Sequence, residues 1–139
     1  MQAVAAELLP RGITGAMLAE LEDGWASLLD EEPDINRVGD RGTRLFEVAA
    51  RLLRIEFKDE TLGMAGRLFA GVEAGRRGLV DVVAGNPGTG GPRIERRARP
   101  LTAFAALAAR DLRRGGPPFE PEATPGRALT LLVHRLTGR

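Results

Sequence analysis

The segment that looks most like a chemical motif is the glycine-rich stretch from Gly85 to Pro92, which follows the apolar run Leu79–Val83. A strand leading into such a loop is typical of a Walker A site, where a lysine reaches the β- and γ-phosphates and a Ser or Thr hydroxyl ligates magnesium. Gly91 and Pro92 stand at those two positions, and they supply neither the charge nor the hydroxyl. We therefore interpret the segment as a linker.

Two features involving carboxylates are candidate sites, a pair and a single residue. Asp30 and Asp34 have the DxxxD spacing that places two magnesium-binding carboxylates one helical turn apart. Pro33 lies between them and argues against a continuous helix, so we interpret the pair as a solvated helix end with Asp34 as its cap. Glu47 follows Phe46 on an amphipathic segment, and such a carboxylate is either drawn into a cleft or solvated; we expect the latter.

Other catalytic chemistry is limited by the residue types present. The chain has no Cys, which excludes disulfides, thiolate catalysis, zinc ribbons and iron–sulfur ligation. Its single histidine, His134, cannot build a His-rich metal site and suggests no Ser/His/Asp triad. We expect it to be a structural residue at the surface or partly buried, beside Arg135. The sequence thus predicts no catalytic, cofactor-binding or metal-ligating residue.

Composition indicates one globular domain over residues 1–139, because 43% hydrophobic and 28% charged residues are ordinary values. Aromatic residues make up only 4%, so the core must be built from Leu, Ala and Val, which favours helices. Residues 1–92 carry ten Lys and Arg against fifteen acids, whereas residues 93–139 carry ten Arg against four acids. One interpretation is that the two parts face one another in the fold or that their charges lie on the solvated surface. The other is that the Arg-rich part binds an anion such as a phosphate or an acidic lipid surface.

The sequence also argues against nucleic acid as a partner, against a membrane span and against a signal peptide. Nucleic-acid binding is not expected, since no recognition motif accompanies the arginines and the only aromatics of the basic part are Phe104 and Phe119. The apolar run Leu101–Ala109 is far shorter than the roughly 20 residues that span a bilayer. Residues Met1–Leu9 lack the basic start of a signal peptide. We expect a cytoplasmic protein without a transmembrane segment.

Hydrophobic periodicity predicts five helices and no sheet, after a short stripe that Pro10 and Gly12 end. The predicted stripes are Ile13, Met17, Leu18, Leu21, Trp25, Leu28 and Leu29; Val38, Leu45, Phe46, Ala49, Leu52 and Leu53; Leu62, Ala65, Leu68, Phe69 and Val72; Leu101, Phe104, Ala105, Ala108 and Leu112; and Leu129, Leu132, Val133 and Leu136. Asp34 or Asn36, Asp59 and Thr124 are the predicted caps. Gly/Pro-rich linkers are expected near 84–92 and 115–123. The predicted fold class is an all-α, single-domain helical bundle.

The order of these segments resembles the later half of the squalene/phytoene synthase family. The resemblance is carried by Leu21–Trp25, the acidic stretch to Asp34 and Gly39–Phe46, and it extends over nearly the whole chain to the Arg-rich tail at 97–139. It implies part of the isoprenoid synthase fold. In that family two aspartate-rich motifs hold magnesium and the diphosphates. The first would precede Met1, and Leu68–Arg77 has one carboxylate where the second would have several.

The resemblance therefore implies a protein of isoprenoid biosynthesis that lacks its own prenyl-transferase activity and needs no cofactor. The alternative is a non-enzymatic helical interaction or assembly module that binds a protein partner or an apolar ligand. A third interpretation is an incomplete domain whose missing helices come from another subunit.

A half-fold predicts uncovered apolar surface. It would leave a face of Leu45, Phe46, Leu68 and Phe69 exposed, at a cost of about 25 cal/mol per Å². Gly63, Gly66 and Gly71 would let a second backbone approach this face closely. We expect the face to be covered by a homodimer or by a bound prenyl or other apolar ligand.

Overall fold

The computed structural model describes residues 7–26, 29, 34–79, 94–115 and 123–138, and all regular structure in them is helical. This confirms the all-α prediction. The elements are the 3-10 turn η1 (Leu9–Arg11), helices α2 (Gly15–Ala26) and α3 (Ile35–Leu52), the π-helical turn η3 (Asp59–Gly63), and helices α4 (Met64–Arg76), α5 (Arg99–Arg113) and α6 (Pro125–Thr137). The predicted linkers at 84–92 and 115–123 fall almost entirely outside the described residues.

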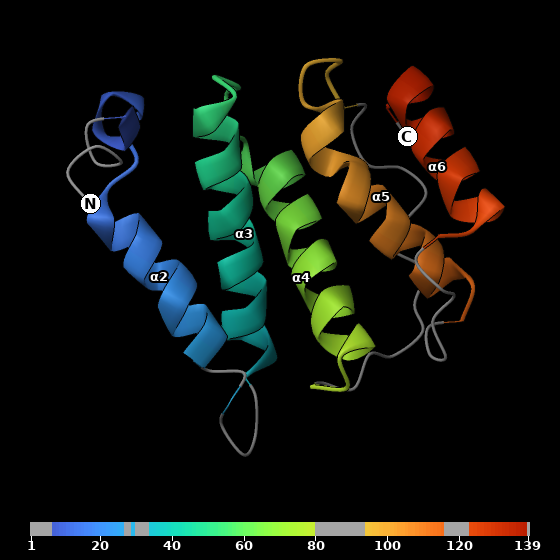
Figure 1. The fold of residues 1–139 in the computed structure, drawn as a ribbon, viewed down its shortest axis with the longest axis horizontal. Helices are drawn as coiled ribbons and strands as arrows, with labels where there is room; N and C mark the ends of the chain where they lie inside the picture. The colour runs from blue at the N-terminus through green and yellow to red at the C-terminus, as the bar shows by residue number, and fades with distance from the viewer. Residues whose placement is uncertain (1–6, 27–28, 30–33, 80–93, 116–122, 139) are drawn as a thin grey trace.

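The helices form a bundle drawn out as a row, in which α2 to α6 follow one another in chain order (Figure 1). Each helix packs mainly on its neighbours in sequence, so α2 and α6 are the two ends of the row. The α3–α4 contact is the most extensive. Among the described helices, each end helix therefore has a helical neighbour on one side only.

The ends of the helices follow the cap residues in the sequence. Asp34 caps α3 through its Oδ1 atom, which accepts a hydrogen bond from the backbone N–H of Asn36 at 2.8 Å. Thr124 caps α6 in the same way, its hydroxyl oxygen lying 3.4 Å from the backbone nitrogen of Arg127. Gly138 ends α6 with φ 76°, in the left-handed region that favours glycine. These predictions from capping chemistry are confirmed.

The predicted cap at Asp59 is wrong. The helical backbone begins one residue earlier, because the carbonyl of Lys58 accepts hydrogen bonds from the N–H groups of Leu62 and Gly63 at 2.8 and 3.4 Å. Asp59 is thus the first residue of the π-helical turn η3, and its carboxylate lies 3.6 Å from the Arg67 guanidinium on α4.

A glycine pair sets the distance between α3 and α4. A Cβ atom built on Gly66 would lie 2.2 Å from the carbonyl oxygen of Gly42, and one built on Gly42 would lie 2.1 Å from that of Gly66. Close approach at Gly66 was predicted, but it serves packing inside the chain rather than a second copy. Gly63 is likewise enclosed, 2.0 Å from the Asp59 carboxylate by the same construction, and Gly71 faces open space.

The described core consists of small apolar clusters between neighbouring helices. Ile13, Met17 and Val48 join α2 to α3, and a second cluster of Val38, Ala70 and Ala74 joins α3 to α4. A third cluster connects the end of α3, the turn η3 and the start of α5; its buried members are Ala50, Leu62 and Ala98. Between α5 and α6 the buried side chains are instead largely polar.

Two predictions about the apolar stripes need correction. The face expected to lack cover is only partly open, because Phe46 is buried and Leu45, Leu68 and Phe69 are half-buried among α3, α4 and α5. The stripe of α6, predicted to help hold the bundle together, is exposed along its whole length; its members are Leu129, Leu132, Val133 and Leu136. Among the residues that the structure describes, no helix has the length and apolar character required to cross a membrane.

Candidate functional site

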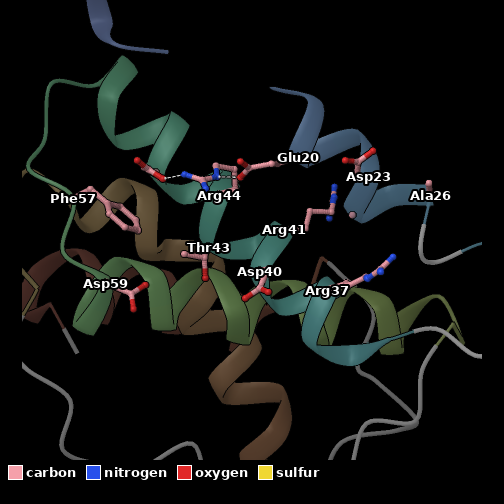
Figure 2. A pocket seen from close by; sticks show the side chains of 12 residues that line it. Glu20, Asp23, Ala26, Arg37, Asp40, Arg41, Thr43, Arg44, Phe57 and Asp59 are labelled. Carbon is pink, nitrogen blue, oxygen red and sulfur yellow. Dashed lines mark hydrogen bonds and ion pairs between the residues drawn. The ribbon is translucent and has the colours of Figure 1, made fainter. Parts of the chain in front are cut away.

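A charged pocket of about 860 Å³ lies between α2, α3 and the chain entering η3 (Figure 2). Charged side chains of both signs line it, namely Glu20, Asp23, Asp40, Glu47 and Asp59 together with Arg37, Arg41 and Arg44. Because the wall holds both carboxylates and guanidiniums, these groups can pair with one another. A charged group could bind a ligand only if it is not already part of such an ion pair.

Ion pairs within the wall occupy the carboxylate of Glu47. Its Oε2 accepts from Arg44, which also pairs with Glu20 on α2, and its Oε1 lies 2.7 Å from Arg51 Nη2. Burial alone would raise the pKa of Glu47, but the hydrogen bond from Arg51 and the charges of Arg44 and Arg51 outweigh it and lower the pKa. Glu47 is thus held in its charged form by two arginines of its own helix, of which Arg44 also pairs with Glu20 on α2. A carboxylate bound in this way is a poor general base.

One arginine of the pocket wall, Arg41, also contacts Trp25, which does not line the pocket itself. The Arg41 guanidinium lies 3.9 Å from the centre of the indole ring, and that of Arg77 lies 5.1 Å from it, so two cation–π contacts hold this half-exposed aromatic residue. The pKa of Arg41 is lowered chiefly by burial, with Glu73 opposing the shift and Arg77 adding to it. Among the described residues, no three His, Cys, Asp or Glu side chains are placed to hold a metal ion. The ion pairs described in the pocket wall therefore serve mainly to hold α2 and α3 together.

A second concave surface, which we call the apolar groove, crosses α3, α4 and α5. It has a volume of about 360 Å³ and is lined by Leu45, Phe46, Leu53, Phe69, Pro100, Leu101 and Phe104. Three aromatic rings run across it, with centroids 6.0 Å apart for Phe46 and Phe69 and 5.8 Å apart for Phe69 and Phe104. Phe104 is 61% exposed, whereas Phe side chains are more often buried in the core.

A smaller pocket of about 300 Å³ shares Phe69 and Phe104 with the groove and ends at a buried ion cluster. Asp111 on α5 is its centre: Arg127 Nη1 lies 2.7 Å from both carboxylate oxygens, and Arg76 Nη2 lies 2.5 Å from Oδ2. Arg110 lies 3.8 Å away. One carboxylate thus ties α4 and α6 to α5, and its oxygens are occupied by arginines.

His134 and Thr102 form the second polar contact between α5 and α6. His134 Nε2 lies 2.8 Å from Thr102 Oγ1, and both side chains are buried. The prediction of a histidine at the surface or partly buried is wrong in its burial, because α6 turns this face toward α5. Its contact is a helix-to-helix hydrogen bond, which agrees with a structural role.

The remaining sequence candidates are not brought together. The Gly85–Pro92 segment and Asp30 lie outside the described residues, and Asp34 is occupied as a helix cap. Sequence reasoning missed the Asp111 cluster, although a signal existed: Asp111 is the only acid in α5 and continues the spacing of the buried residues Ala105 and Ala108. A charged residue on a core-facing stripe calls for a buried counter-charge.

Comparison of the chain with models of known protein families, with curated proteins and with solved structures gives no match. The likeness to the squalene/phytoene synthase family therefore stays a prediction from the sequence.

Proposed function

We propose that this domain is a non-enzymatic helical module that binds an apolar ligand, of the hydrocarbon-chain type, in the groove across α3, α4 and α5. The observation that carries the proposal is the composition of the groove: every lining residue is apolar, including three aromatic rings in contact. Its volume of about 360 Å³ falls within the range of small-molecule sites, which are mostly apolar concavities.

Binding is favoured over catalysis because of the chemistry of the lining. Leu, Phe and Pro side chains neither exchange protons nor act as nucleophiles, so the groove offers a ligand burial of apolar area and little else. The nearest buried carboxylate, Asp111, is held by Arg127 and Arg76. An apolar chain gains about 25 cal/mol for each Å² removed from water, which suits a ligand without polar groups along its length.

The resemblance to the squalene/phytoene synthase family bears on the kind of ligand. The resemblance implies that the stripes containing Leu45, Phe46 and Phe69 face an apolar cavity. These three residues line the groove. This supports a prenyl chain as the first ligand to test. Membership of that family and a place in isoprenoid biosynthesis remain predictions.

Calorimetric titration with farnesol, a neutral isoprenoid alcohol, tests the proposal. Calorimetry is preferred to Trp25 fluorescence, because Trp25 contacts Arg41 and Arg77 and does not line the groove. We expect saturable binding that Phe104→Glu and Leu53→Glu each weaken at least tenfold, since both side chains are exposed on the free protein and tolerate a charge. Leu18→Glu on α2 is the matched control and should leave affinity unchanged.

Two outcomes would overturn this function. The first is the absence of saturable binding, and the second is binding that the two groove variants leave intact. A parallel titration with farnesyl diphosphate, with and without magnesium, separates the alternatives. Equal affinity in both conditions supports recognition of the chain alone, whereas binding that requires magnesium would favour a synthase-like diphosphate site instead.

A further inference from the structure

Helix α6 presents its apolar stripe to solvent and its polar stripe to the protein. Leu129, Leu132, Val133 and Leu136 are 60%, 54%, 46% and 67% exposed. Their steps of three and four residues place them on one face of the helix. The side chains that face α5 are polar, with Arg127 and His134 both buried.

The outward direction of the stripe is fixed by contacts along the whole helix. At its start, Arg127 binds the buried Asp111, and one turn before its end His134 contacts Thr102. At its end, Arg99 Nη1 on α5 donates to the carbonyls of Arg135 and Leu136 at 2.9 and 2.8 Å. Turning the stripe inward would break these contacts, so the exposed position is the folded state of α6 and not a loose end.

No described helix packs on the outer side of α6, so its place in the row leaves this face available to another molecule. Helix α6 is an end of the row, and α5 is its main neighbour (Figure 1). Single exposed apolar residues are ordinary, but a contiguous stripe on one helix marks a contact surface.

We propose that the occupant is a second copy of this chain, with the two α6 helices packed antiparallel across a twofold axis. The spacing of the stripe is the same from either end of the helix: Leu129 and Leu136 are its outer members, and Leu132 and Val133 are its centre. Antiparallel pairing sets Leu129 against Leu136 of the second copy and Leu132 against its Val133. Such self-complementarity is the requirement for a twofold interface.

The charges of α6 favour the same orientation. The helix contains no Asp or Glu, and its cation at the edge of the stripe is Arg135. Parallel pairing would bring two Arg135 side chains together at the same level, and like charges in contact are unfavourable. Antiparallel pairing separates them by the length of the stripe and places each Arg135 beside Ala128 and Thr130 of the second copy.

The exposed area sets the strength of the dimer. The four side chains offer roughly 400 Å² per protomer, about half of the ~800 Å² that each partner buries in a standard interface. An interface of this size is typical of weak, transient contacts, so we expect a dimer that dissociates on dilution. The apolar groove lies across α3, α4 and α5, so this inference does not depend on the proposed function.

Sedimentation velocity over a protein concentration series tests the dimer. We expect the wild-type chain to shift from monomer to dimer, and Leu132→Glu to weaken association at least tenfold. Leu9→Glu in η1 is the matched control, because Leu9 is 62% exposed and lies near the other end of the row; it should dimerise as wild type does. Circular dichroism melts of both variants check that the fold is retained.

Disulfide trapping tests the orientation, because the chain contains no cysteine. A mixture of Leu129→Cys and Leu136→Cys proteins should form a mixed disulfide, while each alone should not cross-link efficiently. Self-cross-linking of each variant would mean parallel helices and would overturn the proposed geometry. A wild-type chain that stays monomeric at all concentrations, or that uses the stripe to bind anionic vesicles instead, would overturn the choice of a second copy.

Discussion

Replacing Gly66 by Ala should destabilise the domain, although alanine is the better helix former. In an isolated helix, Gly→Ala gains up to about 1 kcal/mol. Here the added Cβ would lie 2.2 Å from the carbonyl oxygen of Gly42 and 3.0 Å from the backbone nitrogen of Thr43, compared with 3.4–4 Å for ordinary contacts. Backbone atoms of α3 cannot rotate away as a side chain does, so the two helices must separate.

The size of this effect follows from two opposing contributions. Overpacking of a tight interface costs about 1–3 kcal/mol, occasionally more, and the helix-propensity gain offsets only part of that cost. Since α3–α4 is the most extensive contact in the row, we expect the upper end, a net loss of about 2 kcal/mol in the free energy of unfolding. For a chain of this length that loss lowers Tm by roughly 5–10 °C.

Gly71→Ala on the same helix supplies the control. Nothing lies within 4 Å of a Cβ built at Gly71, so this variant should gain about 0.5–1 kcal/mol from helix propensity alone. Urea unfolding followed by circular dichroism measures both variants. The two identical substitutions, five positions apart, should therefore change the free energy of unfolding in opposite directions. Equal stabilisation by both would refute the close approach of α3 and α4.

The remaining predictions concern charged groups. Asp111→Asn should cost about 3–5 kcal/mol of unfolding free energy, because Arg127 and Arg76 would lose their buried counter-charge; Asp34→Asn, which keeps a capping side chain, is the control, and a loss below about 1 kcal/mol would contradict the burial of the cluster. Glu47 has a pKa below its ordinary value in the folded state, so its contribution to stability is present above the unfolded pKa and is lost as pH falls through the folded pKa. Glu47→Gln should accordingly flatten the acid side of the stability-versus-pH curve measured by chemical unfolding, and an unchanged acid slope would count against the ion pairs.

The helices themselves were predictable because their signals are local. Apolar spacing located α3, α4 and α5, and the side chains of Asp34 and Thr124 cap helices as their chemistry predicts. A cap depends on a few neighbouring residues, so one sequence is enough to find it. The prediction that Asp59 is an N-cap was wrong for a reason that is also local. The carbonyl of Lys58 already receives the first hydrogen bonds of the helical turn, which composition alone does not reveal.

The orientation of a helix depends on what lies opposite it, and sequence periodicity does not report that. The stripes containing Val38 and Ala105 face the core, whereas the equally regular stripe of α6 faces solvent. Close approach at Gly66 was read correctly, but its partner is Gly42 within the chain. For the apolar groove, the sequence pointed to Leu45, Phe46 and Phe69 but not to Leu53, Pro100 or Phe104. The groove walls come from three helices, and no single segment encodes their relative placement.

Asp111 explains why α6 is turned with its apolar face outward. This carboxylate is 3% exposed on α5, and a buried charge without a partner costs several kcal/mol. With the stripe turned inward, leucines would cover Asp111 and carry Arg127 to the far side of the helix. The gain from burying four half-exposed apolar side chains would then be set against an uncompensated charge and a broken Thr102–His134 contact. The polar face therefore decides the rotation of α6, and the apolar face is left as the surface that a second molecule can cover.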